Sequence, residues 1–295
     1  MTRKTDMSVP QGALDLYDAY AHGELSRRGF FSGLSKFAVG GVTVSTLAAC
    51  IMPDYEGEQQ TREGDSGFVE ETLIYQSPQG AGEMAGYLVK PAGATEPLGG
   101  VVVIHENRGL NPHIRDVARR AAKAGYIAFA PDALYPLGGY PGNDDDGRVM
   151  QRERGRAEML FDFMAAAETL RDRKDCSGKV GCVGFCFGGA ISNLMAVRQP
   201  WLAAAVPFYG GWPAEDEAAL VKVPLQIHLA DLDKRVNAGW PPYQAALDAA
   251  GAPYEVHMYS DANHGFHNDT TPRYDAEDAA LAWSRTLRFF AKHLA

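Results

Sequence analysis

The sequence contains the stretch Lys179-Val-Gly-Cys-Val-Gly-Phe-Cys-Phe-Gly-Gly-Ala-Ile-Ser-Asn193. Its first half is apolar and β-branched, and its second half is compatible with a helix. Between the halves, Cys186 has a glycine two residues away on each side, which is the pattern of a nucleophile elbow with cysteine in place of serine. Such a turn needs strained backbone angles and small neighbours, and the helix after it favours a thiolate. The stretch predicts a reactive cysteine; the alternative is a glycine-rich turn around an inert one.

Composition narrows the class of protein. The chain has 295 residues, of which 46% are hydrophobic and 22% charged, as in soluble globular proteins. Its net charge of −9 argues against a nucleic-acid partner, since phosphate binding needs a basic face. The four cysteines do not form a disulfide framework in a chain of this length, and we expect Cys182 to be a small core residue.

The first fifty residues differ from the rest. Ser26-Arg27-Arg28-Gly29-Phe30-Phe31 precedes a mildly apolar stretch, residues 37–49, as in a twin-arginine export signal. At 13 residues this stretch is too short to span a membrane. It ends in Leu47-Ala-Ala-Cys50, which resembles a lipoprotein processing site with Cys50 acylated. We therefore expect the twin-arginine machinery as a partner, a lipid anchor at Cys50, and a periplasmic or membrane-anchored protein. The alternative is a cytoplasmic protein whose N-terminal arm folds onto the domain through apolar residues, among them Leu14, Leu16, Tyr17 and Tyr20.

The remaining chain divides into a linker, residues 51–68, and one domain, residues 69–295. Residues 71–75 and 84–89 read as a hairpin of two strands, and 100–105 and 126–130 as buried strands. Residues 134–147 form a loop in which Asp144-Asp-Asp-Gly147 reads as a solvated lid. Strands and helices then alternate to the end of the chain. This order predicts an α/β fold with a mostly parallel, doubly wound sheet and an active site at the carboxyl ends of its strands.

A thiol nucleophile needs a base, and the base needs a group that orients it. Asp233 follows the strand at 225–229, and His264 follows the strand at 254–259. The order Cys186, Asp233, His264 is the nucleophile–acid–base order of α/β hydrolases. Asp233 is preferred to Asp231 because it lies further into its loop, and His264 is preferred to His267 because a glycine follows it.

The loop at residues 105–112 follows a strand beside the elbow. In this fold it supplies one N–H of the oxyanion hole, here Asn107, and the residue after the nucleophile, Phe187, supplies the other. Glu106 would then be a carboxylate close to the thiol. His105-Glu106 lacks the second histidine of a zinc protease, so we predict no metal and no cofactor. His105, His113, His228 and His257 read as strand or helix-edge residues satisfied by hydrogen bonds.

With these residues assembled, the chain from about residue 70 to its end resembles the dienelactone hydrolase (carboxymethylenebutenolidase) family, which has an eight-stranded α/β-hydrolase fold with helices on both faces. The marks are Val103-Ile-His-Glu106, Asn111-Pro-His-Ile-Arg-Asp-Val-Ala-Arg-Arg120, Ala130-Pro-Asp132, Gly184-Phe-Cys-Phe-Gly-Gly189, Asp233-x-x-Val236 and Asn263-His-Gly-Phe266. The resemblance implies a Cys186–His264–Asp233 triad, a glutamate, Glu106, that pairs with the thiol, and a substrate-side tyrosine, Tyr209.

The resemblance also has departures. The family's two carboxylate-binding arginines are missing: one region reads Ala133-Leu-Tyr-Pro-Leu-Gly138, and the other position is Asn268. Arg108 or Arg273 could substitute, although surface salt bridging explains each as well. The expected function is hydrolysis of a small ester or lactone through an acyl-thioester. A thioesterase or peptidase on the same fold, or a non-catalytic exported binding protein, are the alternatives. The sequence leaves the oligomeric state open.

Overall fold

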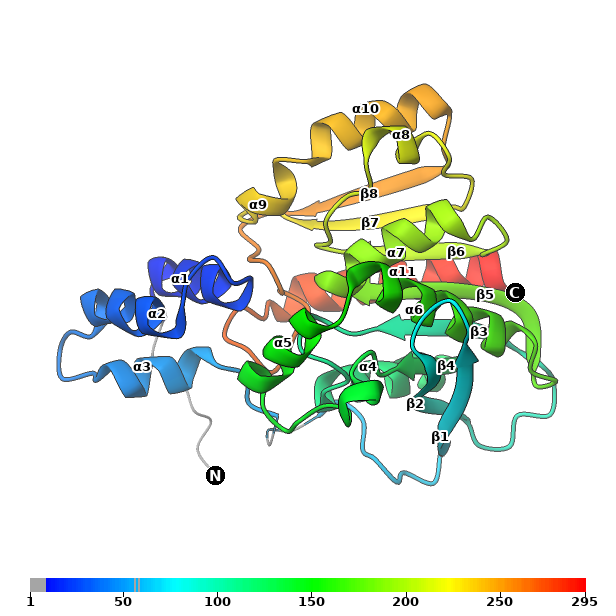
Figure 1. The fold of residues 1–295 in the computed structure, drawn as a ribbon, viewed down its shortest axis with the longest axis horizontal. Coiled ribbons are helices and arrows are strands. Elements are labelled where there is room, and N and C mark those ends of the chain that lie inside the picture. Colours follow the sequence, from blue (N-terminus) through cyan, green and yellow to red (C-terminus); the bar gives the residue numbers. More distant parts are fainter. Residues whose placement is uncertain (1–8, 56, 58) are drawn as a thin grey trace.

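The computed structural model describes residues 9–55, 57 and 59–295 (Figure 1). Its elements in chain order are α1 (Gln11–Ala21), α2 (Arg27–Leu34), η1 (Ser35–Phe37), α3 (Val44–Ile51), β1 (Phe68–Ser77), β2 (Gly82–Pro91), β3 (Leu98–Ile104), α4 (Pro112–Lys123), β4 (Ile127–Pro131), η2 (Tyr135–Leu137), α5 (Asp144–Glu153), α6 (Arg156–Arg171), β5 (Cys176–Phe185), α7 (Phe187–Arg198), β6 (Ala204–Phe208), α8 (Glu215–Ala218), β7 (Leu225–Ala230), α9 (Lys234–Asn237), α10 (Trp240–Ala250), β8 (Tyr254–Tyr259) and α11 (Ala276–Leu294).

The strands form one eight-stranded sheet in the order β1-β2-β4-β3-β5-β6-β7-β8. The β1–β2 and β2–β4 pairs are antiparallel, and every pair from β4 to β8 is parallel. The predicted hairpin is thus β1 and β2, and the predicted mostly parallel sheet is confirmed. The parallel strands bring their carboxyl ends to one edge, where the loops after β3, β5, β7 and β8 meet.

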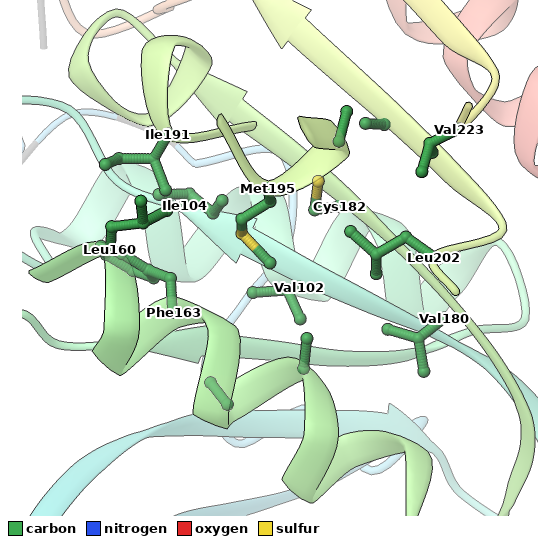
Figure 2. Close-up of a cluster of buried hydrophobic side chains, with 14 of the residues drawn as sticks. Val102, Ile104, Leu160, Phe163, Val180, Cys182, Ile191, Met195, Leu202 and Val223 are labelled. Atoms are coloured by element: carbon green, nitrogen blue, oxygen red, sulfur yellow. The ribbon is translucent and has the colours of Figure 1, made fainter. Parts of the chain in front are cut away.

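Helices cover both faces of the sheet, because successive strand residues point to opposite sides. Val102 and Ile104 of β3 face the core under α6 and α7, whereas Val101 and Val103 face the core under α4 and α11. Figure 2 shows Cys182 inside the first of these cores, where it is fully buried. Burial raises the pKa of its thiol to about 12, as expected of a small core residue.

The N-terminal segment folds into α1, α2 and α3, which we call the arm. Figure 1 shows it in blue at the end of the sheet toward which β7 and β8 point. The arm has a small core of its own, centred on Phe30, whose ring stacks on Tyr20 with centroids 4.9 Å apart. It also binds the domain: the Tyr20 hydroxyl donates to Asp145 at 2.6 Å, and Gln11 donates to Asn263 at 2.5 Å. Leu14 and Tyr17 are buried too, as the folded-arm alternative requires.

The prediction of a solvated lid at Asp144–Gly147 is wrong, because these residues are the first turn of α5. Asn143 caps the helix by accepting from the Asp146 N–H at 2.9 Å, and acidic residues in a first turn interact favourably with its positive end. Asp144 also accepts from the buried Arg108 at 2.7 Å. The run of acidic residues predicted a solvated loop. The segment is a helix instead, because Asn143 caps its first turn and Arg108, which is distant in sequence, binds Asp144.

Residues 51–68 join the arm to β1 and lie against the domain where they are described. The Thr61 N–H donates to the buried Asp116 carboxylate at 2.8 Å, and Arg119 donates to the Thr61 hydroxyl at 2.9 Å. Within the described residues, no helix combines the length and the apolar character that crossing a bilayer requires.

Candidate active site

Cys186 lies between β5 and α7 on a strained turn. Its φ of 57° falls in the left-handed region, which residues other than glycine adopt rarely. A Cβ on Gly184 would lie 2.0 Å from the Gly188 carbonyl oxygen, and a Cβ on Gly188 would lie 2.3 Å from that of Ile104. Both positions therefore need glycine, as the elbow pattern predicted. Such strain is stored where the surrounding fold over-determines the backbone.

The structure brings Asp233, rather than Asp231, against His264. The imidazole Nδ1 lies 2.5 Å from the Asp233 carboxylate, which also accepts from the Val236 N–H at 3.1 Å as the N-cap of α9. Asp231 is exposed. His267 turns away and stacks on Phe185 with ring centroids 5.0 Å apart. Of the two candidate histidines, only His264 therefore has an aspartate behind it and the cysteine in front.

The Cys186 sulfur lies within 4.8 Å of a ring nitrogen of His264. Burial opposes ionisation of the thiol, but the positive charges of His22 and His264 outweigh it and lower the pKa of Cys186 to about 5. Burial likewise opposes protonation of His264, but the charges of Asp233, Asp18 and Cys186 raise its pKa to about 10. This arrangement can hold a thiolate beside an imidazolium at neutral pH.

His22 was missed by sequence reasoning. It caps the end of α1 in the arm, and its Nε2 lies 3.3 Å from the Cys186 sulfur. Its signal was absent from the sequence because 164 positions separate the two residues. His22, Cys186 and His264 could together face a metal ion, but the Arg235 guanidinium lies 3.0 Å from His22 Nε2. That positive charge stands where a cation would bind, so the cluster suits a thiolate better than a metal.

Glu106 is buried in a polar network behind the elbow. Its carboxylate accepts from the Asn268 amide at 3.1 Å and lies 3.5 Å from Arg108 Nε. Burial opposes ionisation, but the neighbouring Arg108, His113 and Arg273 charges hold the pKa of Glu106 below its ordinary value. Asn268, which stands in place of a family arginine, therefore binds Glu106.

The two arginines suggested as substitutes are not surface residues. Arg108 is 2% exposed and Arg273 is 4% exposed, so the surface salt-bridge alternative is wrong for both. Arg108 binds Asp144 at 2.7 Å, and Arg273 binds Asp18 of the arm at 3.2 Å. Both belong to buried networks that hold α5 and the arm in place.

A cavity of about 370 Å³ opens beside the sulfur. Asn107 and Phe187, the predicted oxyanion residues, and Tyr209 line it together with Cys186. The Tyr209 ring lies 4.9 Å from the His264 ring, and burial raises the pKa of its hydroxyl well above the ordinary value. Five arginines also line it, namely Arg148, Arg152, Arg154, Arg156 and Arg235. Of the described residues that line the cavity, none is an aspartate or glutamate.

Three of the four histidines with predicted structural roles have the hydrogen bonds predicted for them, whereas His257 is described by a ring contact with His228, with centroids 5.4 Å apart. His105 lies 2.6 Å from the Glu106 carbonyl and accepts from the Ala133 N–H at 3.2 Å. His228 pairs with the Tyr259 hydroxyl at 2.8 Å, and His113 pairs with Asp269 at 2.9 Å.

Residues 84–294 match the profile described as "Dienelactone hydrolase family", and residues 1–40 match one described as "YqhI-like". The Escherichia coli K12 protein "Putative hydrolase fragment YghX" is 54% identical over 112 residues, which are 38% of this chain and 96% of that protein. A Yersinia pestis protein described as "Putative carboxymethylenebutenolidase" is 32% identical over 231 residues, covering 73% of this chain and 86% of that one.

A solved structure described as a "Putative Dienelactone Hydrolase" from Klebsiella pneumoniae superposes with a TM-score of 0.67. It is 28% identical and covers 76% of this chain and 99% of its own. The family profile spans the sheet from β2 to β8, including the elbow and the loops of Asp233 and His264. The chain belongs to the dienelactone hydrolase family and is a carboxylic ester or lactone hydrolase.

Proposed function

We propose that the protein hydrolyses a small ester or lactone with Cys186 as nucleophile, through an acyl-thioester intermediate. The observation that carries this proposal is the position of the Cys186 sulfur, on a strained elbow next to an imidazole that Asp233 orients. The thiolate attacks the carbonyl carbon, a carbon–sulfur bond forms, and the carbonyl electron pair moves onto the oxygen. The N–H groups of Asn107 and Phe187 hold that oxyanion, and one such donor is typically worth about 3 kcal/mol.

His264 then serves both halves of the reaction. The tetrahedral intermediate collapses by breaking the bond to the leaving alkoxide, which takes a proton from the His264 imidazolium. The neutral imidazole removes a proton from water, whose oxygen attacks the thioester carbonyl. The second intermediate expels the Cys186 thiolate and releases the carboxylic acid. Each proton transfer contributes about a hundredfold or more.

The cavity supports a negatively charged substrate. Five arginines line it together with Cys186, and one of them, Arg235, lies on α9, the helix that begins directly after Asp233. Arg154 is held by Asp162 and by Glu158, whereas Arg152 and Arg156 are exposed. These last two are therefore free to turn toward an anion, and we assign them the role that the family's missing arginines leave open. A carboxylate on the acyl part suits this lining, because guanidinium groups bind carboxylates with two parallel hydrogen bonds.

Replacing the nucleophile tests the mechanism. We expect Cys186→Ala to lower kcat for a small activated ester by about a thousandfold or more, because the covalent route is lost. The matched control is Cys182→Ala, which removes a thiol from the core, four residues before the elbow, and should keep its activity. Circular dichroism checks that both variants are folded. Cys186→Ala with wild-type turnover would refute the thioester mechanism.

For the N-terminal segment we propose that it stays attached as the folded arm of a cytoplasmic protein. The burial of Leu14, Tyr17 and Tyr20 supports this. Twin-arginine export with cleavage near Cys50, and lipidation there, is the competing proposal. The mass of the protein recovered from its native cell separates them, since cleavage would remove the first 49 residues.

A further inference from the structure

One residue outside the region that matches the dienelactone hydrolase profile contacts the sulfur. The family profile begins at residue 84, whereas His22 belongs to the arm. Its Nε2 lies 3.3 Å from the Cys186 sulfur, and its ring meets that of His264 edge-on with centroids 4.7 Å apart. The sulfur therefore lies next to two imidazoles, of which the family pattern accounts for one.

The arm orients the His22 ring. Nδ1 lies 2.8 Å from the backbone carbonyl of Asp18 and 3.3 Å from the Asp18 carboxylate. Both are acceptors, so Nδ1 carries a proton, and Nε2 of the neutral ring presents its lone pair to two donors, the Arg235 guanidinium at 3.0 Å and the thiol at 3.3 Å. His264 is oriented in the same way by Asp233.

The charges around His22 come from three other segments. Arg235 of α9 lies 3.0 Å from Nε2, and Arg273 binds Asp18 from the loop before α11. His264 lies opposite. Asp18 offsets these cations: burial raises its pKa, but His264, His22 and Arg273 together lower it well below the ordinary value, so it stays charged. Arg235 is 37% exposed in its side chain and can turn to solvent when Nε2 gains a proton.

We propose that His22 is a second histidine of the catalytic centre, which takes the proton of the Cys186 thiol before substrate binds. This rests on the proposed function of Cys186. The sulfur–hydrogen bond breaks, a nitrogen–hydrogen bond forms at Nε2, and a thiolate–imidazolium pair results. His264 remains available for the leaving group and for water. The arm is then part of the catalytic unit.

The docked arm does not close the cavity beside Cys186, so it is compatible with substrate binding. Ala21 and His22 form part of its wall, and the remaining space is still about 370 Å³. The Asn107 amide donates to the Ala21 carbonyl at 2.7 Å, which ties the predicted oxyanion loop to the arm. The arm therefore shapes the site while leaving room for a small substrate.

The test measures the rate of iodoacetamide alkylation of Cys186 against pH in the full chain, which requires no substrate. The variants are His22→Gln and two controls, His293→Gln on the last helix and Tyr20→Phe, which loses an arm–domain hydrogen bond. We expect half-maximal rate near pH 5 in the wild type and in both controls. In His22→Gln the midpoint should rise by at least one pH unit, which is at least about a twofold loss of rate at pH 6.

A midpoint in His22→Gln equal to that of the wild type would overturn the role of His22. A rise equally large in Tyr20→Phe would also overturn it, because loosening the arm would then account for the effect. Ester turnover measured in parallel keeps this test separate from that of the mechanism. An inactive wild-type protein with the expected alkylation shift would refute the hydrolysis proposal and leave His22 as the partner of the thiol.

Discussion

At the level of single residues, the site consists of the Cys186 sulfur, two histidines beside it, and an aspartate behind each histidine. Asp18 and Asp233 each bind the Nδ1 of a histidine, and the two histidines, His22 and His264, each turn toward the sulfur. A buried thiolate without cations would be costly, since burial alone raises the pKa of a thiol. Here two oriented imidazoles reverse that effect, which separates Cys186 from the inert Cys182 in the same strand.

The opposite shifts predict a broad pH profile. The thiolate persists above pH 5 and is lost as the pH falls through that value, because the folded-state pKa of Cys186 is depressed. The imidazolium of His264 persists until the pH rises through about 10, because its pKa is raised. We expect kcat/KM for a small ester to be bell-shaped with limbs near these values, which belong to the coupled pair.

The check is a rate measurement with an ester that hydrolyses slowly on its own across that range. As control, Asp233→Asn should move the alkaline limb downward, because His264 loses its strongest negative neighbour. If the acid limb of the profile lay near pH 8.5, the ordinary pKa of a thiol, the thiolate–imidazolium pair would be contradicted.

At the scale of elements, β5 and α7 make the turn possible only because their glycines admit close backbone contacts. Gly188 passes the carbonyl oxygen of Ile104 at the end of β3, and Gly189 passes that of Phe208 at the end of β6. The elbow is therefore locked between its two neighbouring strands. That contact holds Cys186 in the left-handed region of backbone angles.

Gly188→Ala should lower the free energy of unfolding by about 1–3 kcal/mol or more, since the added methyl group would meet backbone atoms that cannot move aside. Urea denaturation followed by tryptophan fluorescence measures this. Gly155→Ala is the matched control in the domain: its nearest new contact is the Glu158 Cβ at 3.9 Å, and the change should stay within about 1 kcal/mol. Equal stability of the two variants would show that the elbow tolerates a side chain.

At the scale of the whole molecule, two cores lie on the faces of the sheet and a third lies inside the arm. The arm touches the domain through polar contacts such as Gln11–Asn263 and Arg27–Asp145, and through the site itself. Because its core is separate, it can lose stability without unfolding the sheet.

Phe30→Ala should therefore release the arm while the domain stays folded. Replacing a buried phenylalanine by alanine typically costs about 3–5 kcal/mol, and Phe30 is fully buried. Hydrogen exchange should speed up in residues 11–51, with an unchanged urea midpoint by fluorescence, since all four tryptophans lie in the domain. Val39→Ala, at a residue 69% exposed, is the control and should leave both unchanged. A lowered domain midpoint in Phe30→Ala would mean that arm and sheet unfold together.

The features that depend on neighbours along the chain could be predicted from the amino-acid sequence. Alternating apolar strands and helices imply the parallel sheet, the glycines around Cys186 imply the elbow, and the positions of Asp233 and His264 at strand ends imply that they meet. These inferences hold because parallel strands bring their carboxyl ends to one edge whatever the details of packing.

The side chains that surround those groups could not be predicted in this way, because they depend on how the chain packs in three dimensions. The partners of Glu106, the arginines of the cavity and above all His22 come from segments far apart in the chain, and their contacts depend on how helices settle on the sheet. The arm shows this most clearly. Its local composition is typical of a signal peptide. In the folded chain its aromatic rings are buried in a core, and His22 reaches the Cys186 sulfur because the arm lies against the domain.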